Sequence, residues 1–168
     1  MRPSLVILDR DGVLNEDSGY PYLPEQIVWR TGVFPAPRSL RAEGINVVVA
    51  TNQSGVGRGF FTALDVENLH RWMAREIEAN GGRVERFYYC PYLPDAPLAD
   101  YRLESIDRKP GPGMLLRAMS EYSAAPDQTV MIGDKASDLD AAKAAGVRGL
   151  LFEGPDLEAF IRQHVLAD

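Results

Sequence analysis

The sequence predicts an α/β fold, a three-layer α/β/α sandwich built on a Rossmann-like parallel sheet. Three observations lead to it. Residues 5–8, 45–50 and 129–132 form short, mostly apolar runs of strand length, which suit strands buried on both faces of a parallel sheet. Helical patterns alternate with these runs, as in consecutive βα units. Polar motifs follow the runs directly, at the strand ends where such sheets bind ligands.

The remaining elements complete this alternation. Weaker strand patterns cover residues 87–89 and 147–152. Helices are expected at residues 36–43, 63–79, 114–122, 137–145 and 156–165. Thr62 is a plausible N-cap for the longest of them, and Gly81-Gly82 follows its end. A chain of 168 residues fits a single domain, 1–168, and no segment is long enough to form a separate cap domain. The long proline-containing loop at about 91–107 is expected to be functional or mobile.

Composition narrows the classes of partner. A formal net charge of −6 with no basic stripe argues against nucleic acid. No apolar run approaches the roughly 20 residues that cross a bilayer. The only cysteine, Cys90, cannot form an intrachain disulfide, and the N-terminal residues lead into a strand pattern rather than a signal-peptide core. We therefore expect a cytoplasmic protein, a monomer, without nucleic-acid or membrane partners.

Two carboxylates follow the first strand at Asp9 and Asp11, and Gly12 permits a tight turn after them. At this spacing one magnesium ion can be shared between the Asp9 side chain and the Asp11 carbonyl, which leaves the Asp11 side chain free for proton transfer. A solvated acidic turn is the alternative interpretation. Asp-x-Asp alone does not decide between them.

The second strand ends in a stretch rich in hydroxyls, amides and glycine, from Thr51 to Gly59. Such groups can converge on a phosphate oxygen without obstruction by Cβ atoms. An ordinary turn is the alternative, and the absence of Gly-Lys-Ser/Thr excludes a P-loop. Arg108 and Lys109 precede a later helix, where a lysine can neutralise both a phosphate and an acidic nucleophile. A surface basic pair is the alternative there.

A further acidic motif, Gly133-Asp134-Lys135, follows the strand at 129–132. Asp134 can supply another magnesium carboxylate, and Lys135 can hold the substrate. Asp138 has two open roles, because it could orient Lys135 or cap the following helix.

These four strand-end motifs, in this order, resemble those of the haloacid dehalogenase superfamily of phosphohydrolases. The matching positions are Asp9–Gly12, Thr51, Lys109 and Gly133–Asp138. The resemblance implies that Asp9 attacks phosphorus to form an aspartyl phosphate, with Mg²⁺ held by Asp9, Asp134 and the carbonyl of Asp11. It implies that Asp11 is the general acid and base. Thr51, Arg108 and Lys109 would hold the transferring phosphoryl group.

Several longer stretches resemble the branch that contains the D-glycero-D-manno-heptose 1,7-bisphosphate 7-phosphatases of lipopolysaccharide precursor synthesis. They are residues 9–15, 17–20, 51–59, 89–91, 108–110 and 133–135. The related histidinol-phosphate phosphatases and other small sugar-phosphate phosphatases remain alternatives. The resemblance implies a small phosphorylated sugar as substrate, met by Asp17, Ser18, Gly19, Tyr20, Asn52, Gln53, Ser54, Arg58, Lys135 and the loop from Pro91.

The chain departs from this branch in one loop. Many members bind zinc there through Cys-x-His and Cys-x-Cys, whereas the corresponding residues here are Cys90, Tyr92, Ser105 and Asp107. One thiolate and one carboxylate do not supply the four good donors of a structural zinc site. We therefore expect Mg²⁺ as cofactor and no zinc, with Cys90 a small core residue.

Two non-catalytic alternatives remain. A receiver-like phospho-switch also places Asp, Thr and Lys at the ends of a parallel sheet, but its acceptor Asp follows a later strand than Asp9 does. A degenerate member that only binds is disfavoured, because every catalytic position is filled.

Overall fold

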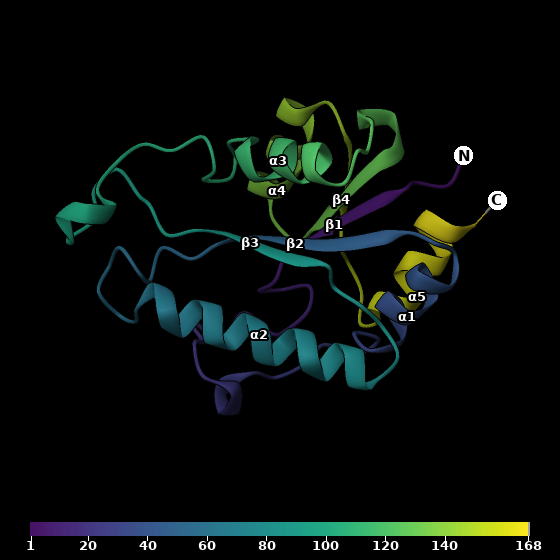
Figure 1. Cartoon of the computed structure of the whole chain (residues 1–168), viewed down its shortest axis with the longest axis horizontal. Coiled ribbons are helices and arrows are strands. Elements are labelled where there is room, and N and C mark those ends of the chain that lie inside the picture. Colours follow the sequence, from purple (N-terminus) through teal and green to yellow (C-terminus); the bar gives the residue numbers. More distant parts are fainter. Residues whose placement is uncertain (168) are drawn as a thin grey trace.

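A five-stranded parallel sheet forms the centre of the computed structural model, which describes residues 1–167 (Figure 1). The strand order is β3-β2-β1-β4-β5, and every neighbouring pair is parallel. The strands are β1 (Leu5–Leu8), β2 (Asn46–Asn52), β3 (Arg86–Cys90), β4 (Thr129–Gly133) and β5 (Arg148–Leu151). The predicted fold class and all five predicted strands are confirmed.

Five α-helices connect and cover these strands. They are α1 (Pro35–Ala42), α2 (Ala63–Ala79), α3 (Gly113–Glu121), α4 (Ala136–Ala145) and α5 (Leu157–Ile161). The helix predicted at 156–165 is divided, since α5 is followed by a π-helical turn, Arg162–Leu166. Short 3-10 turns lie at Pro24–Gln26, Ala99–Tyr101 and Pro126–Gln128. The remaining predicted boundaries agree with the structure to within one or two residues.

The helices form two layers, with α1, α2 and α5 on one side of the sheet and α3 and α4 on the other (Figure 1). The alternation of side chains along β1 produces both cores. Val6 and Leu8 belong to the cluster beneath α1, α2 and α5, whereas Leu5 and Ile7 belong to the cluster beneath α3 and α4. All four residues of β1 are completely buried, as expected for the central strand of a sheet covered on both faces.

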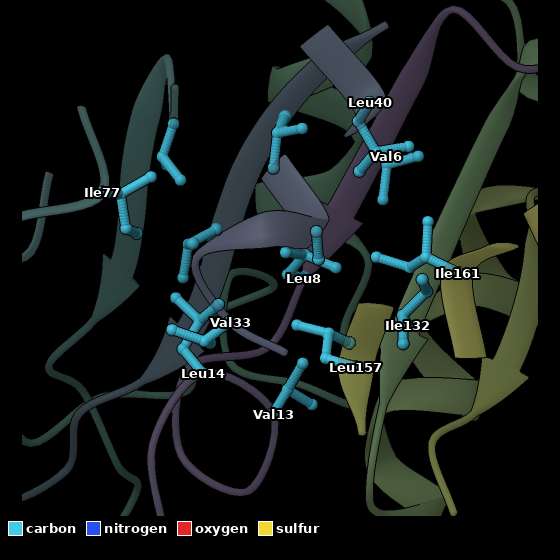
Figure 2. Packing of buried hydrophobic residues seen from close by; sticks show 14 of the residues in the cluster. Val6, Leu8, Val13, Leu14, Val33, Leu40, Ile77, Ile132, Leu157 and Ile161 are labelled. Carbon is cyan, nitrogen blue, oxygen red and sulfur yellow. The ribbon is translucent and has the colours of Figure 1, made fainter. Parts of the chain in front are cut away.

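Figure 2 shows the first of these cores at close range. Side chains of the sheet, among them Val6 and Ile132, point toward Leu40 of α1 and Ile161 of α5. Burial of apolar area of this kind contributes about 25 cal/mol per Å² removed from water. The packed core fixes β1 and β4 side by side, so the residues that follow them emerge at one edge.

The predicted cap of α2 is confirmed. The Thr62 hydroxyl accepts a hydrogen bond from the Asp65 amide at 3.1 Å, and the Asp65 carboxylate accepts one from the Thr62 amide at 2.8 Å. This reciprocal arrangement satisfies two amide donors at the start of the helix. It sets where α2 leaves the loop that follows β2.

The two long connections near the carboxyl ends of the strands hold little regular structure. Residues 9–34 and 91–112 contain short 3-10 turns and isolated bridges, and within residues 1–167 neither forms a separate cap domain. Leu93 pairs with Arg102 across the second connection. None of the helices described is long and apolar enough to span a membrane.

Two adjacent leucines of α3 test the assignment of the second core. Leu115 is completely buried, whereas its neighbour Leu116 is 45% exposed. We expect Leu115→Ala to lower the free energy of unfolding by about 2–5 kcal/mol, because it leaves a cavity. Leu116→Ala should change that free energy by less than about 0.5 kcal/mol. Chemical denaturation of the two variants measures both values, and equal losses would contradict the assigned packing.

Candidate active site

The carboxyl ends of three central strands meet around one buried ammonium group. Lys109 Nζ donates to Asp9 Oδ1 at 3.0 Å, to Asp138 Oδ1 at 2.6 Å and to the carbonyl of Ala50 at 2.8 Å. Asp9 follows β1, Ala50 lies in β2, and Asp138 stands near the start of α4, directly after β4. Only 4% of Lys109 is exposed. One cation therefore joins three segments that are distant in sequence.

Asn52 fixes the backbone that carries this lysine. Its Oδ1 accepts a hydrogen bond from the Lys109 amide, and its Nδ2 donates to the Lys109 carbonyl, each at 3.0 Å. The loop before α3 is thus bound to the end of β2 through one side-chain amide. Asn52 was predicted as a substrate contact, and both of its polar atoms are engaged with the Lys109 backbone.

Asp138 combines two contacts. Its Oδ2 accepts a hydrogen bond from the backbone amide of Lys135 at 3.1 Å, so of the two roles left open for Asp138 the structure shows the helix cap. Its Oδ1 binds Lys109, a role that sequence reasoning missed. The only hint of this contact in the sequence was the place of Asp138, one turn into a helix that begins at the Gly133-Asp134-Lys135 motif. Lys135 Nζ instead donates to Asp17 Oδ2 at 3.0 Å.

The electrostatics around Asp9 follow from burial. Burial raises the pKa of Asp9 to about 7, with Asp138 and Asp11 adding to the rise and Lys109 opposing it. Burial lowers the pKa of Lys109, but the carboxylates of Asp9 and Asp138 outweigh burial and raise it overall. The lysine therefore stays protonated and favours the charged form of Asp9.

Three carboxylates are close enough to share a metal ion. Ligand atoms of Asp9, Asp134 and Asp138 lie within 4.8 Å of one another. Asp134 Oδ1 is buried and has no hydrogen-bond partner among residues 1–167, and burial raises the pKa of Asp134. A metal ion binds the ionised carboxylates, and three of these against one ammonium group would leave two negative charges. An all-oxygen set with this excess charge fits Mg²⁺.

Of these ligands, Asp9 and Asp134 are the residues that would hold the ion, because both oxygens of Asp138 already accept hydrogen bonds. The Asp11 carbonyl is the predicted third ligand. Gly12 allows Asp134 to lie close to the turn that carries Asp11. Its φ of +90° favours glycine, and a Cβ at this position would overlap the Asp134 carboxylate.

Asp11 is held by donors from its own loop and from the loop that follows β2. Arg10 Nε and Nη2 donate to Asp11 Oδ1 at 3.1 and 3.0 Å, and Nη2 also reaches Oδ2 at 3.2 Å. Asn15 Nδ2 donates to Oδ1 at 2.9 Å, and Gln53 Nε2 donates to Oδ2 at 3.1 Å. Gln53 Nε2 also donates to Thr51 Oγ1 at 2.8 Å. Arg10 and Asn15 were not predicted as site residues.

A polar cavity of about 480 Å³ opens over these groups. Most of the predicted substrate contacts line it, together with Ser137, which sequence reasoning missed. The lining residues are Asp11, Asp17, Gly19, Tyr20, Asn52, Gln53, Ser54, Arg108, Lys109, Lys135 and Ser137. A smaller recess of about 60 Å³ is lined by Asp9, Thr51 and Asp138 among others. The carboxylates predicted to be catalytic, Asp9 and Asp11, thus lie at the edge of a space that can hold a small polar molecule.

Comparison with known proteins places the chain in a family. The HAD-hydrolase-like family model matches residues 106–154. A D-glycero-beta-D-manno-heptose-1,7-bisphosphate 7-phosphatase from Rhodopseudomonas palustris is 43% identical over 162 residues, which cover 96% of this chain and 89% of that protein. The chain belongs to the haloacid dehalogenase (HAD) superfamily of phosphatases.

Two further HAD phosphatases extend the comparison. The D-glycero-alpha-D-manno-heptose-1,7-bisphosphate 7-phosphatase of Burkholderia mallei is 37% identical over 88% of this chain and 78% of that protein. The crystal structure of D,D-heptose 1.7-bisphosphate phosphatase from B. bronchiseptica, complexed with magnesium and phosphate, has a TM-score of 0.80 and 33% identity. It covers 95% of this chain and 86% of that one. The family membership confirms the predicted resemblance.

Two predicted substrate contacts of this HAD phosphatase lie outside the cavity lining. Ser18 is exposed and does not line it. Arg58 Nε donates to Ser54 Oγ at 3.4 Å, and its guanidinium carbon lies 5.9 Å from the centroid of the Tyr20 ring. Tyr20 also contacts Phe60 edge to face, with the ring centroids 4.9 Å apart. Arg58 therefore supports the wall of the cavity through Tyr20 and Ser54.

The loop that corresponds to the family's zinc site is held by other contacts. Cys90 is buried, its Sγ lies 4.0 Å from the Tyr92 carbonyl, and burial raises the pKa of its thiol. The Asp107 carboxylate pairs with Arg117. The absence of zinc stays a prediction.

Gly12 allows a matched test of the metal site. Gly12→Ala should weaken Mg²⁺ binding at least about tenfold, because its Cβ would displace the Asp134 carboxylate. Gly44 is the control, since its φ is also positive, at +73°, but nothing lies within 4 Å of a Cβ there. Gly44→Ala should cost about 1–2 kcal/mol of stability from backbone strain and leave Mg²⁺ affinity unchanged. Calorimetric titration decides, and equal affinities for both variants would refute the overlap.

His70 should make stability depend on pH. Burial, and then the charge of Arg10, lowers the pKa of His70 well below 6.5. As pH falls, the His70 ring is therefore protonated in the unfolded chain before it is protonated in the folded protein. The contribution of the neutral ring to the free energy of unfolding is complete above about pH 6.5 and is lost as pH falls below that value. Relative to His70→Gln, the wild-type free energy of unfolding should fall by about 1.4 kcal/mol per pH unit between roughly pH 6 and 5. Exposed His164→Gln should keep the wild-type slope in denaturant titrations.

Proposed function

We propose that this HAD phosphatase is a Mg²⁺-dependent hydrolase that removes the 7-phosphate of a D-glycero-D-manno-heptose 1,7-bisphosphate through an aspartyl-phosphate intermediate. One observation carries the proposal: the buried Asp9–Lys109–Asp138 cluster lies beside a 480 Å³ polar cavity. The near full-length similarity to heptose bisphosphate phosphatases supports the sugar.

Asp9 is the nucleophile in this mechanism. Its carboxylate forms a bond to phosphorus while the bond from phosphorus to the sugar oxygen breaks. Lys109 favours the charged form of this carboxylate by opposing the rise in its pKa, and it stabilises the negative charge that shifts onto the phosphoryl oxygens. Thr51 lies beside Asp9 in the deep recess, where its hydroxyl can donate to one of those oxygens. Arg108, in the cavity lining, supplies a second cation.

Asp11 transfers the protons. As an acid it protonates the departing sugar oxygen, and as a carboxylate it then takes a proton from the water that attacks the aspartyl phosphate. Its place in the lining of both the cavity and the recess puts it within reach of both reacting groups. Mg²⁺ held by Asp9, Asp134 and the Asp11 carbonyl would neutralise phosphoryl charge and orient the phosphate.

The rest of the cavity would meet the sugar and its second phosphate. Lys135 and Arg108 provide cations for an anionic substrate, and Asp17, with Ser54, provides hydrogen-bond acceptors for hydroxyl groups. The relatives include phosphatases named for the beta and for the alpha anomer. The substrate test below therefore compares the two anomers.

The alternatives carry less support. Histidinol phosphate would fit the same chemistry, but the curated relatives reported above are named for heptose bisphosphate. A receiver-like switch is disfavoured because the proposed nucleophile follows the first strand and the relatives are phosphatases. We further propose a cytoplasmic, monomeric, single-domain enzyme of carbohydrate metabolism without bound zinc, which metal analysis of protein purified without added zinc would check.

Phosphate release from a substrate panel tests the proposal. The panel holds both anomers of heptose 1,7-bisphosphate, histidinol phosphate and hexose 6-phosphates, with Mg²⁺ present. We expect kcat/KM for one heptose anomer to exceed that for histidinol phosphate at least about 100-fold, because a site built for paired polar contacts rejects substrates that leave them unpaired.

Asp9→Asn is the control for the mechanism. It changes little volume, removes the nucleophile and should reduce turnover at least about 10⁴-fold, with the fold intact by circular dichroism. A preference for histidinol phosphate would overturn the substrate while preserving the mechanism. Turnover retained by the Asn variant would exclude the covalent intermediate.

A further inference from the structure

A fully buried arginine stands between the two catalytic carboxylates in the sequence. Arg10 has no exposed surface, yet it carries a permanent positive charge. Burial of such a charge is tolerated only with an anionic partner and acceptors for its N–H groups. The Asp11 carboxylate is that partner, and the Pro21 carbonyl accepts from Nη2 at 3.1 Å. Arg10 is therefore part of the structure that surrounds Asp11.

The contacts restrict the orientation of the Asp11 carboxyl group. Oδ1 accepts from two nitrogens of Arg10 and from Asn15, all within 3.1 Å. Oδ2 accepts from Arg10 and Gln53 at 3.2 and 3.1 Å. Because Oδ1 already has three donors, Oδ2 is the oxygen available for proton exchange with a substrate. A different orientation of the Arg10 guanidinium would break its hydrogen bonds to Asp11 and leave the carboxyl group free to rotate.

His70 sets the orientation of the guanidinium. Arg10 Nη1 and His70 Nε2 are 3.1 Å apart, and because the guanidinium only donates, the ring nitrogen accepts and the proton is on Nδ1. The ring is stacked on Phe87, with centroids 4.6 Å apart, and it is 95% buried. Burial and the charge of Arg10 lower the pKa of His70, which keeps the accepting nitrogen unprotonated.

We propose that Arg10 is the positioning residue of the general acid Asp11, and that His70 orients Arg10 from α2. This inference rests on the proposed function, in which Asp11 protonates the leaving group. In that step the phosphorus–oxygen bond breaks as Asp9 bonds to phosphorus, and the proton of Asp11 moves to the departing oxygen. Water then attacks the aspartyl phosphate: its oxygen bonds to phosphorus as the bond from phosphorus to Asp9 breaks, and its proton moves to Asp11. Arg10 stays protonated and His70 stays neutral throughout.

The proposal predicts a dependence on leaving group. A poor leaving group needs its proton in the transition state, whereas p-nitrophenolate departs as a stable anion. Loss of positioning should therefore reduce kcat/KM for phenyl phosphate much more than for p-nitrophenyl phosphate. kcat/KM reports the steps up to release of the phenol, so the later hydrolysis of the aspartyl phosphate does not enter. Both probes are independent of the sugar, so a failed heptose assignment leaves this test intact.

Arg10→Lys keeps the charge but loses the planar fork. We expect kcat/KM for phenyl phosphate to fall at least about tenfold and that for p-nitrophenyl phosphate by less than about threefold. Because Arg10 is completely buried, this variant could fail to fold, and a pair of substitutions at His70 tests the same proposal. His70→Leu removes the acceptor and should reproduce the selective loss. His70→Gln restores an acceptor. The ratio of kcat/KM for phenyl phosphate to kcat/KM for p-nitrophenyl phosphate should therefore return to at least about a third of its wild-type value.

Exposed His164→Gln is the control and should leave both kcat/KM values unchanged. Thermal unfolding and Mg²⁺ titration identify the variants that are folded and bind the ion. A selective loss that Gln repairs supports the proposal. Equal losses on both substrates, no loss in His70→Leu, or no difference between Leu and Gln at position 70 would each overturn it.

Discussion

The ammonium group of Lys109 is the contact on which the rest of the site depends. It is buried against Asp9 and Asp138, and its backbone is bound to Asn52. Removal of one partner from a buried pair of this kind costs about 3–5 kcal/mol, because the other charge is left uncompensated. The lysine therefore joins the ends of β1, β2 and β4 electrostatically, and it also balances the charge of the proposed nucleophile, Asp9. The surplus of negative charge that remains is what a divalent cation would balance.

The parallel sheet explains why residues so far apart can meet in this way. β1 lies between β2 and β4, so the segments that leave β2 and β4 each start about 4.8 Å from the segment that leaves β1. Short side chains such as Asp9 and Thr51 suffice at this spacing. Lys109 approaches from a loop and needs its long side chain to reach the same point. The apolar strands thus supply rigidity, and the catalytic groups lie on turns that the strands hold in place.

The fold and the main positions proposed to be catalytic could be predicted because short stretches of the sequence indicate both. Asp9 and Asp134 each follow directly on an apolar run, and the order of the strands then brings them together. The supporting contacts could not be predicted in this way. Asp138 meets Lys109 across 29 residues, and His70 meets Arg10 across 60. Nothing in the neighbourhood of a histidine within an amphipathic helix indicates which distant side chain it will contact.

The two carboxylates proposed to be catalytic, Asp9 and Asp11, are supported from opposite faces of the sheet. Asp9 is tied through Lys109 to α4, in the layer that also contains α3. Asp11 is tied through Arg10 to His70 of α2, in the other layer (Figure 1). Because the sheet separates these layers, the proposed mechanism implies that a change of packing under α2 alters the proposed proton donor, Asp11, without displacing the proposed nucleophile, Asp9. On that proposal, residues that never contact the substrate adjust protonation of different leaving groups, while the Asp9–Lys109 pair stays unchanged.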